Sequence, residues 1–558
     1  MIGKRIRHIS RYRDIAITLI RNGFGMVVEE TGITQFLSLP QRLFFEKKEK
    51  ASKSVGERIR IVLEELGPTF VKLGQISSTR PDLIPEEIIR ELEKLQDHVP
   101  PFSFQEVREI VQSELGEEIE NIFLHFEDVP LAAASIGQVH RATLHTGEQV
   151  AVKIQRPNIT TVIETDLEIL QDLATLAEQR SELAEKYQIR DMMDEFSKSL
   201  REELDYTNEA RNAEKIANQF KDDSTIYVPK VFWEYSTKKV LTMEYVEGVK
   251  FNEIDQLKKN GYNLKNLAER LAKGIFQQVF IGGFFHGDPH PGNVLVLPGE
   301  IIAFLDFGMA GRLTPDMRYH FSSLIISLMR QSTDGVIHSI SAMGLIPDDV
   351  NMKQLQADVE RMREKYYDVP LSQIRLGEAV NDLFRLAFQH SIRIPADLSL
   401  LGKTLLTVEG VVENLDPEFS ILDIAEPFGR RLLKERYHPK NVAETVWKQV
   451  SDYGELILDF PKHMKEFTSL VKRGRLRMEV GIPELDLFLK KLDQISNRLS
   501  FSIVLLSFSI IMVGIIIGSS MNRQSTLLWK FPAIEMGFVV ATLMFFWLLY
   551  SIFKSGRF

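Results

Sequence analysis

The sequence predicts an α+β fold in which short paired strands alternate with long helical segments, and three observations support this class. Two pairs of short strand-like runs each flank a tight turn, over residues 137–154 and 294–305. Longer segments, at 30–120, 255–285 and 315–425, place apolar residues at helical spacing. The third observation is a pair of long apolar runs near the C-terminus, which predicts a hairpin of two transmembrane helices.

The composition fits a folded chain that is too long for one ordinary domain. Of the 558 residues, 44% are hydrophobic and 26% are charged, so we expect two or three structural units. The net charge of −9 argues against nucleic acid as a partner, because a phosphate backbone needs a basic surface. The chain has no cysteine, which excludes disulfides, thiolate metal sites and cysteine nucleophiles.

The N-terminal segment is basic, and we expect residues 1–120 to form a helical N-terminal extension. Residues 1–25 scatter basic side chains among isoleucines and lack the compact apolar core of a signal peptide. Two interpretations of this segment stay open. It is either a basic amphipathic helix on an anionic membrane surface or an ordinary solvated helix or frayed end.

From about residue 121 the pattern changes to strands, which predicts a second unit over residues 121–425. Strand-like runs at 137–143 and 148–154 flank a His-Thr-Gly turn and predict a hairpin. Further strands are predicted at 230–233 and 240–245. Helical patterns fill most of the remainder of this unit.

A charged, helix-prone connector over residues 426–498 precedes the predicted membrane hairpin at 499–554. Residues 501–518 carry no charge, and residues 531–553 carry only Glu535. Hydrocarbon about 30 Å thick needs roughly 20 apolar helical residues, so each run predicts a transmembrane helix. Basic residues flank the pair more than they occupy the turn, which favours a multi-pass protein of the inner (cytoplasmic) membrane with its large N-terminal part in the cytoplasm.

Polar residues with the chemistry of a metal site gather in residues 285–312. Two short strands joined by a Pro-Gly-Glu turn predict a hairpin whose open end brings Asn293 beside Asp306, with Asp288 in the preceding loop. Such oxygen ligands suit Mg²⁺, and an aspartate displaced from the metal can orient or deprotonate a nucleophile. We predict Asn293 and Asp306 as metal ligands and Asp288 as a catalytic residue.

These residues match the arrangement found in protein kinases. His286, Asp288 and Asn293 stand in H-x-D-x-x-x-x-N order, and Asp-Phe-Gly begins at Asp306. Lys153, at the end of a Val-Ala-Val-Lys strand, is the expected lysine that clamps the α- and β-phosphates of ATP. The pattern therefore predicts a two-lobed protein-kinase-like fold with ATP and Mg²⁺ as cofactors and Lys153 as a catalytic and nucleotide-binding residue.

Lys153 needs a carboxylate partner from the helical segment that follows its strand. The stretch REELDYTNEA supplies the candidates Glu202, Glu203, Asp205 and Glu209. Periodicity alone does not choose between Glu203 and Glu209, so both stay candidates for the nucleotide site.

The loop that should cover the phosphates is altered. It is rich in alanine instead of glycine, with Ala132, Ala133, Ala134 and Ser135 followed by Ile-Gly. Alanine narrows the allowed backbone and cannot approach phosphates as closely as glycine. The Ala-Pro-Glu that follows Asp-Phe-Gly in protein kinases is also missing. If this segment covers the phosphates, we expect the nucleotide to bind in an altered geometry and peptide phosphorylation to be disfavoured. The alternative interpretation of the alanine-rich segment is a tight turn packed in the small lobe.

Taken together, the motifs resemble the UbiB/AarF/ADCK family of atypical kinases over roughly residues 55–430. The resemblance rests on KLGQ, which begins at Lys72 and matches the family's KxGQ motif, and on AAASIGQVH, VAVKIQRP, the ExD-like ELDY beginning at Glu203, HGDPHPGN and DFG. It implies that the extension folds over the active site, with Lys72 and Gln75 lining the nucleotide pocket and hindering peptide substrates. It also implies ATPase activity, binding of membrane lipids, and work with isoprenoid quinone precursors and quinone-biosynthesis enzymes.

Three functions are compatible with these features. The leading one is a membrane-anchored, kinase-like ATPase that binds Mg²⁺-ATP and supports isoprenoid quinone biosynthesis, of the ubiquinone or menaquinone type, or lipid handling. The second is a phosphotransferase acting on a protein or a small molecule. The third is a non-catalytic, ATP-sensing membrane scaffold.

Overall fold

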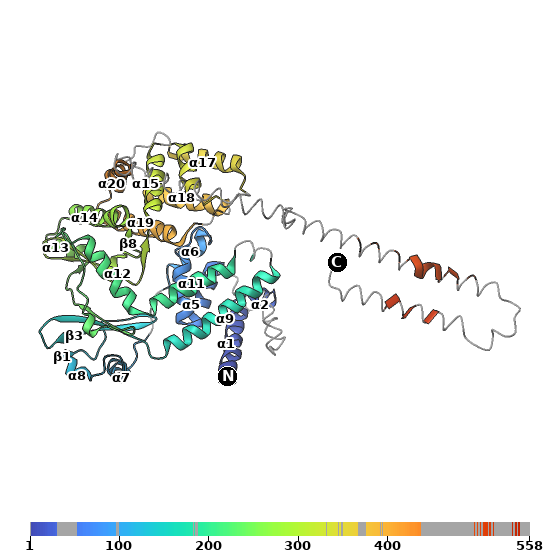
Figure 1. The fold of residues 1–558 in the computed structure, drawn as a ribbon, viewed down its shortest axis with the longest axis horizontal. Coiled ribbons are helices and arrows are strands. Elements are labelled where there is room, and N and C mark those ends of the chain that lie inside the picture. Colours follow the sequence, from blue (N-terminus) through green and yellow to red (C-terminus); the bar gives the residue numbers. More distant parts are fainter. Residues whose placement is uncertain are drawn as a thin grey trace, which may run out of the picture. The chain divides into compact units, whose positions relative to one another are not determined.

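The chain divides into two compact units, Met1–Thr445 and Val446–Phe558. A computed structural model describes residues 2–30, 53–95, 100–181 (with Ala184), 188–330, 332–436 (without 344, 347–349, 367–374, 391 and 393) and scattered positions between 496 and 546. In the first unit, the sheet that contains β1 and β3 lies at one end, and the helices α15, α17, α18 and α20 lie at the other (Figure 1).

The described part of the extension consists of helices joined by turns and short coil segments, as the sequence predicts. Its helices are α1 (Ile2–Arg21), α2 (Gly25–Glu30), α4 (Val55–Leu66), α5 (Pro68–Ser77), α6 (Glu86–Leu92), α7 (Phe104–Leu115) and α8 (Ile119–Ile122). Gly67, at φ 94°, ends α4, and Pro68 begins α5, so the chain changes direction sharply between them. Ser103 and Glu106 form a capping box at the start of α7.

The basic helix α1 is docked on α9 (Ile159–Arg180). The Arg11 guanidinium donates to both carboxylate oxygens of Asp166 at 2.7 and 2.9 Å, and the Tyr12 hydroxyl donates to Asp172 at 2.8 Å. Ile15 and Ala16 are buried against the body. The described part of α1 is therefore a packed helix and not a frayed end, and lipid binding by this helix stays a prediction.

A five-stranded sheet forms the small lobe. Four strands follow the order β1–β3–β4–β6, and β2 pairs with the first part of β3. Its strands are β1 (Phe123–Phe126), β2 (Ala132–Ala133), β3 (Gly137–Leu144), β4 (Gln149–Gln155) and β6 (Val240–Glu244). Strands β3 and β4 form the predicted hairpin. Val150, Val152 and Ile154 are fully buried on one face of β4, so the intervening Lys153 lies on the opposite face.

The prediction of a strand at 230–233 is confirmed only at the centre of this segment. Val231 makes only an isolated bridge to Met243, and Trp233–Tyr235 forms a short 3-10 turn (η2). The Tyr235 amide donates to the Phe232 carbonyl at 3.1 Å, which bends the chain before β6 begins. The Phe232 amide also donates to the Thr242 carbonyl at 2.9 Å, and the Glu244 amide donates to the Lys230 carbonyl at 2.8 Å, so the segment joins β6 at this one bridge and then turns away.

Two helices that contact each other carry the acidic candidates, and the second of them also contacts β6. Helix α11 (Ile189–Glu203) ends at Glu203, and α12 (Tyr206–Gln219) begins three residues later. Asp205 caps α12 by accepting from the Thr207 amide and hydroxyl. The single helical segment expected here is therefore two helices separated by a break.

The large lobe contains two small sheets and a set of helices. One sheet has the order β5–β10–β9–β7, and in the other β8 pairs with β11. These strands are β5 (Ile226–Tyr227), β7 (Val249–Lys250), β8 (Phe284–His286), β9 (Val294–Leu297), β10 (Ile301–Phe304) and β11 (Ala310–Arg312). The helices are α13 (Ile254–Lys259), α14 (Leu264–Phe276) with a π turn (Gln277–Gly282), α15 (Pro315–Met329), α16 (Thr333–Ala342), α17 (Met352–Tyr366), α18 (Leu376–Gln389), α19 (Ala396–Leu415) and α20 (Ile421–Arg436).

The predicted transmembrane hairpin and most of the connector before it fall largely outside the described residues. Within the described part of the chain, no helix is both long and apolar enough to cross a membrane. Several positions of both apolar runs are described and helical, and the rings of Phe508 and Phe545 stack with centroids 4.7 Å apart.

Candidate active site

Lys153 reaches from β4 to a carboxylate on α12. Its Nζ donates to Glu209 Oε2 at 2.8 Å and to Oε1 at 3.1 Å, and the Glu209 side chain is 7% exposed. Asp306 Oδ1 lies 4.0 Å from the same Nζ. Of the two glutamates that the sequence left open, the structure pairs Lys153 with Glu209.

The charges of this trio are coupled. Burial opposes the charged form of Lys153, but the carboxylates of Asp306 and Glu209 outweigh it and raise the pKa of Lys153 well above its ordinary value. Lys153 in turn lowers the pKa of Asp306. Burial raises the pKa of Glu209, although Lys153 acts in the opposite direction. One ammonium group faces two carboxylates, and this excess of negative charge favours a cation near Asp306.

The β9–β10 hairpin places two predicted metal ligands at one end. Val294 pairs with Phe304, and just beyond this pair the Leu305 amide donates to the Asn293 carbonyl at 2.8 Å. The Asn293 side-chain nitrogen donates to the Asp288 carbonyl at 3.2 Å. The hairpin therefore brings Asn293, Asp306 and the loop of Asp288 together, in the way that the sequence pattern predicts.

His286 positions the loop of Asp288. Its Nε2 donates to the Leu305 carbonyl at 2.9 Å, since a carbonyl oxygen only accepts, and its Nδ1 then accepts from the Asp288 amide at 3.1 Å. Burial lowers the pKa of His286, which favours the neutral ring that this pair of bonds requires. The sequence named His286 as part of a motif, and the geometry makes it a positioning residue.

Asp306 has a left-handed backbone conformation, with φ 52°. This region is uncommon for residues other than glycine, and such strain gathers at functional sites. The Gly308 amide donates to Asp306 Oδ1 at 3.1 Å, and the Asn212 side chain donates to the Phe307 carbonyl at 3.0 Å. Sequence reasoning missed Asn212; its place three residues after Glu209 on α12 is the pattern that could have indicated it.

The alanine-rich loop forms without glycine-like backbone angles. Ala132 and Ala133 pair with β3, the Ala134 amide donates to the Gly137 carbonyl at 2.8 Å, and no residue from 132 to 137 has a positive φ. Alanine therefore fits the backbone of this loop. This agrees with the interpretation of the alanine-rich segment as a tight turn packed in the small lobe. Ser135 is fully buried, and its hydroxyl has no hydrogen-bond partner among the described residues. A phosphate oxygen is the kind of group that would satisfy this hydroxyl.

Gly137 is the one glycine that this loop requires. A Cβ at this position would come within 2.3 Å of the Tyr206 hydroxyl oxygen and 2.6 Å of the Ile154 carbonyl oxygen. Tyr206, at the start of α12, is fully buried, and Lys153 Nζ lies 5.3 Å from the centre of its ring. The close approach of loop, strand and helix therefore fixes the surroundings of Lys153.

The KLGQ segment lies on α5 and contacts α11. Lys72 Nζ is 2.6 Å from Glu203 Oε1, and Gln75 Nε2 donates to the Leu95 carbonyl at 3.3 Å. Both residues line a cavity of about 380 Å³ that Gly308 also borders and Lys153 does not. The structure thus places Lys72 and Gln75 beside the segment after Asp306, where Lys72 adds to the lowering of the Asp306 pKa that Lys153 dominates. Their role as nucleotide ligands stays a prediction.

The residues at the hairpin end fit a Mg²⁺–nucleotide site. The Asp306 side chain is half exposed, and the Asn293 nitrogen is committed to Asp288, which leaves the amide oxygen for a ligand. No cluster of three or more His, Cys, Asp or Glu side chains among the described residues could hold a metal. Mg²⁺ is usually held by one or two side-chain oxygens together with phosphate oxygens and water, and Asp306 and Asn293 offer side-chain oxygens of this kind.

Three family models match the sequence. The ABC1 atypical kinase-like domain matches residues 94–340, the UbiB helical domain matches 359–420, and the ABC1/UbiB kinase-like C-terminal domain matches 483–554. The first match contains the site around Lys153. The second contains all of α18 and α19, and the third covers both apolar runs.

Several relatives align over most of the chain. A protein of Xylella fastidiosa (strain M23) named "Probable protein kinase UbiB" is 34% identical over 88% of this chain and 90% of its own. A protein of the same name from Xanthomonas euvesicatoria pv. vesicatoria (strain 85-10) is 35% identical over 87% and 90%. A Clostridium pasteurianum protein, "Uncharacterized protein in hydrogenase 1 5′region", is 33% identical over 98% and 99%.

Solved structures also align with this chain. The structure titled as the complex of Rv3197 and erythromycin from Mycobacterium tuberculosis shares 27% identity and covers 66% of this chain and 93% of its own. Its TM-score of 0.45 is too low to carry an argument about the fold.

Proposed function

Because this chain belongs to the ABC1/UbiB family of atypical kinase-like proteins, we propose that it is a membrane-anchored ATPase that binds Mg²⁺-ATP and supports the biosynthesis or handling of an isoprenoid quinone. The observation that carries the ATPase part is the trio of Lys153, Glu209 and Asp306. These groups come from β4, from α12 and from the second residue after β10, and both carboxylates lie within 4.0 Å of Lys153 Nζ. Such an arrangement binds phosphates on one side and a metal on the other.

Each residue has a defined task in this proposal. Lys153 binds the α- and β-phosphates, and Glu209 holds the lysine in place. Asp306 and Asn293 hold Mg²⁺, which neutralises phosphate charge when bound. Asp288, fixed through its amide by His286, orients a water molecule or accepts its proton.

Hydrolysis, and not peptide phosphorylation, is favoured by what surrounds the site. Helix α5 is fastened to α11 by the pair of Lys72 and Glu203, beside Gly308. A peptide acceptor would have to approach the segment that follows Asp-Phe-Gly, and α5 and this segment line the same cavity. The missing Ala-Pro-Glu removes the usual docking segment as well.

Membrane anchoring is supported by the described residues of the C-terminal runs. Ile503, Leu506, Ile510, Val513 and Ile517 recur every three or four residues, and all are at least half exposed. Leu543 and Phe546 in the second run are similarly exposed. Contiguous exposed aliphatic side chains at this density are a surface that lipid covers.

The test is ATP hydrolysis by the full chain in lipid nanodiscs, with and without anionic lipid and a short-chain quinone precursor. We expect Mg²⁺-dependent turnover that rises with lipid or precursor and falls by at least about 100-fold in Asp306→Asn, since the carboxylate charge is lost at the metal. Asp222→Asn, an exposed aspartate on the same lobe, is the matched control. Turnover unchanged in Asp306→Asn would reject this site, and tight ATP binding without turnover would favour a scaffold.

Phosphotransfer to a small molecule is the second candidate, and one observation favours it. The cavity of about 380 Å³ beside Gly308 is large enough for a small acceptor and is lined by both charged and apolar side chains. Phosphate transferred in stoichiometric amounts from ATP to an added metabolite or lipid headgroup, in place of free phosphate, would establish this reaction instead.

A further inference from the structure

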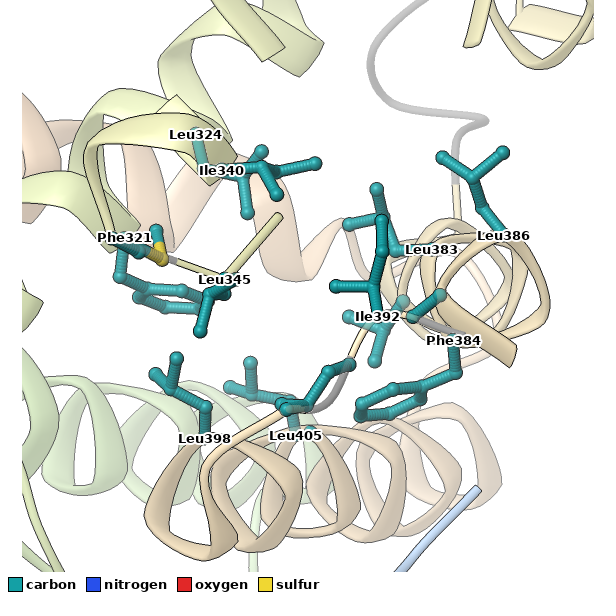
Figure 2. A pocket seen from close by; sticks show the side chains of 15 residues that line it. Phe321, Leu324, Ile340, Leu345, Leu383, Phe384, Leu386, Ile392, Leu398 and Leu405 are labelled. Carbon is teal, nitrogen blue, oxygen red and sulfur yellow. The ribbon is translucent and has the colours of Figure 1, made fainter. Parts of the chain in front are cut away.

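The large lobe contains an apolar cavity that lies outside the ATP site. It has a volume of about 90 Å³ and lies among α15, α16, α18 and α19. Figure 2 shows side chains from opposite walls pointing into one shared space, among them Phe321, Leu383, Leu398 and Leu405. Its lining side chains are hydrocarbon, with one methionine and one glycine. We refer to this space as the apolar cavity.

The chemistry of the apolar cavity restricts what it can bind. No polar side chain lines it, so water would find no hydrogen-bond partner there, and a polar ligand would lose its hydration without compensation. In another protein, an apolar cavity of about 150 Å³ binds benzene, which has six carbon atoms. In proportion to volume, the apolar cavity of about 90 Å³ in this chain accepts about four carbon atoms. A short stretch or the end of a hydrocarbon chain fits this description.

Helix α19 connects the apolar cavity to the catalytic loop (residues 286–293). Leu398, Gly402 and Leu405 line the cavity from one side of this helix. The Thr404 hydroxyl on another side of the helix lies 3.1 Å from the Gly287 carbonyl oxygen. Leu400 packs so closely on Gly287 that an added Cβ would come within 2.9 Å of its Cδ2. A ligand in the cavity therefore touches the helix that supports the loop of Asp288.

The start of α19 also holds the extension. The Arg80 guanidinium donates to the Ile394 carbonyl at 3.1 Å, and Asp82 accepts from the Ile394 amide and from the Ser399 hydroxyl, each at 3.3 Å. Arg80 and Asp82 are themselves paired at 2.9 Å and buried. Ile394 lines the apolar cavity, so one residue is shared between the cavity wall and the anchor of the extension.

We propose that the apolar cavity is a binding site for the hydrocarbon chain of a lipid, and that its occupancy controls ATP turnover through α19. The chain belongs to an isoprenoid or an acyl lipid, which present the same chemistry to this cavity. Filling the cavity shifts the packing of Leu398 and Leu405, and α19 transmits the shift to Gly287 and, through Ile394, to the extension. The binding step stands on the cavity alone, while the effect on turnover rests on the proposed ATPase.

The test measures binding and turnover separately on the full chain in nanodiscs. Two photoreactive probes are used, a geranyl chain and a saturated decyl chain, each carrying a diazirine at its end. Labelled peptides are identified by mass spectrometry, and ATP hydrolysis is measured with non-reactive geraniol and decanol. We expect labelling within α18 and α19 and a change in turnover of at least twofold at saturating chain.

Ala387→Leu is the variant that fills the apolar cavity, because Ala387 is buried in its wall. Ala357→Leu makes the same change at an exposed position of the neighbouring helix α17 and is the matched control. We expect labelling to fall at least fivefold and the response of turnover to vanish in Ala387→Leu only, with basal turnover kept. If Ala387→Leu unfolds, Leu383→Phe, one turn earlier on the same helix α18, narrows the same cavity.

The outcomes separate the parts of the proposal. Stronger labelling by one probe assigns the site to isoprenoid or to acyl chains, and both results support a hydrocarbon site. Labelling confined to the C-terminal apolar runs, or equal in both alanine variants, would overturn the binding site. If the cavity is labelled specifically but ATP turnover does not change with the hydrocarbon chain, the proposed control of turnover is overturned. This outcome leaves the proposed ATPase activity unaffected.

Discussion

Two lysine–glutamate pairs lie on either side of one break in the chain. Lys153 meets Glu209 at 2.8 Å, and Lys72 meets Glu203 at 2.6 Å, so the pairs are nearly equal in length. Their surroundings differ. Glu209 is the more deeply buried glutamate, and Asp306 faces the first lysine as a second carboxylate.

The difference shows that a short distance does not define the role of an ion pair. The pair of Lys153 and Glu209 is built within the kinase-like body, and the second carboxylate at Asp306 leaves excess negative charge beside it. The pair of Lys72 and Glu203 joins the extension to α11. The first arrangement suits the binding of an ionic ligand, and the second suits the fastening of one helix to another.

Breaking the first pair should have the largest effect. In Lys153→Met we expect ATP turnover to fall by about 100-fold or more, because the phosphates lose their cation. We also expect the free energy of unfolding to fall by about 3 kcal/mol, because Glu209 is left buried and unpaired. Turnover and chemical denaturation are measured in parallel, with exposed Lys221→Met as the control.

A double variant sharpens the interpretation of that result. Lys153→Met with Glu209→Gln should recover most of the lost stability, because the uncompensated buried charge is gone, and it should stay inactive. Recovery of turnover in the double variant would contradict the role given to Lys153.

Mild acid should affect the first pair through Glu209. Burial raises the pKa of Glu209 above its ordinary 4.5, so protonation begins at a higher pH than for an exposed glutamate. A folded-state pKa above the unfolded one means that this group adds stability below the unfolded pKa and loses it as the pH rises through the folded pKa. Between pH 7 and 4.5 we therefore expect turnover to fall several-fold while this group's contribution to stability rises.

The pH profiles of wild type and Glu209→Gln test this assignment. The variant has no proton to gain at this position, so its residual turnover should lose the acid limb that Glu209 produces. An identical acid limb in both proteins would assign the fall to another group.

Breaking the second pair should have a smaller effect. In Glu203→Gln we expect a loss of about 1 kcal/mol in unfolding free energy, because the pair is only partly shielded from solvent. Amides of α5 should exchange with solvent faster, whereas amides of α12 should not. Glu202→Gln, its exposed neighbour, is the control, and exchanging the two charges in Lys72→Glu with Glu203→Lys should restore protection of α5.

Ser135→Ala should give the smallest change. It should leave the stability of the nucleotide-free protein equal or higher and should lower the affinity for ATP. Its hydroxyl is buried without a partner among the described residues, so removing it should leave the nucleotide-free protein equally or more stable. The affinity for ATP should weaken roughly three- to tenfold if a phosphate oxygen normally satisfies the hydroxyl. Thermal unfolding and nucleotide titration measure the two effects, with exposed Ser224→Ala as control, and unchanged affinity would contradict the phosphate contact.

The sequence by itself determined the local parts of the site. The β3–β4 and β9–β10 hairpins each join neighbouring runs across a tight turn, and strand alternation then decides which side chains share a face. These rules were enough to place Lys153 on β4 and to bring Asn293 beside Asp306. The strand expected at 230–233 is reduced to a single bridge to β6 because the chain turns at Trp233–Tyr235, and periodicity does not reveal where such a turn begins.

Only the tertiary structure decided which glutamate meets which lysine. Periodicity relates residues within one helix, but the break at Leu204 and Asp205 puts Glu203 at the end of α11 and Glu209 inside α12. The break is held by the Tyr206 amide, which donates to the Lys238 carbonyl at 3.0 Å, a contact between segments more than thirty residues apart. Lys72 and the wall of the apolar cavity likewise depend on packing between distant helices. Long-range packing of this kind sets the direction of each helix, and no local pattern in the chain encodes it.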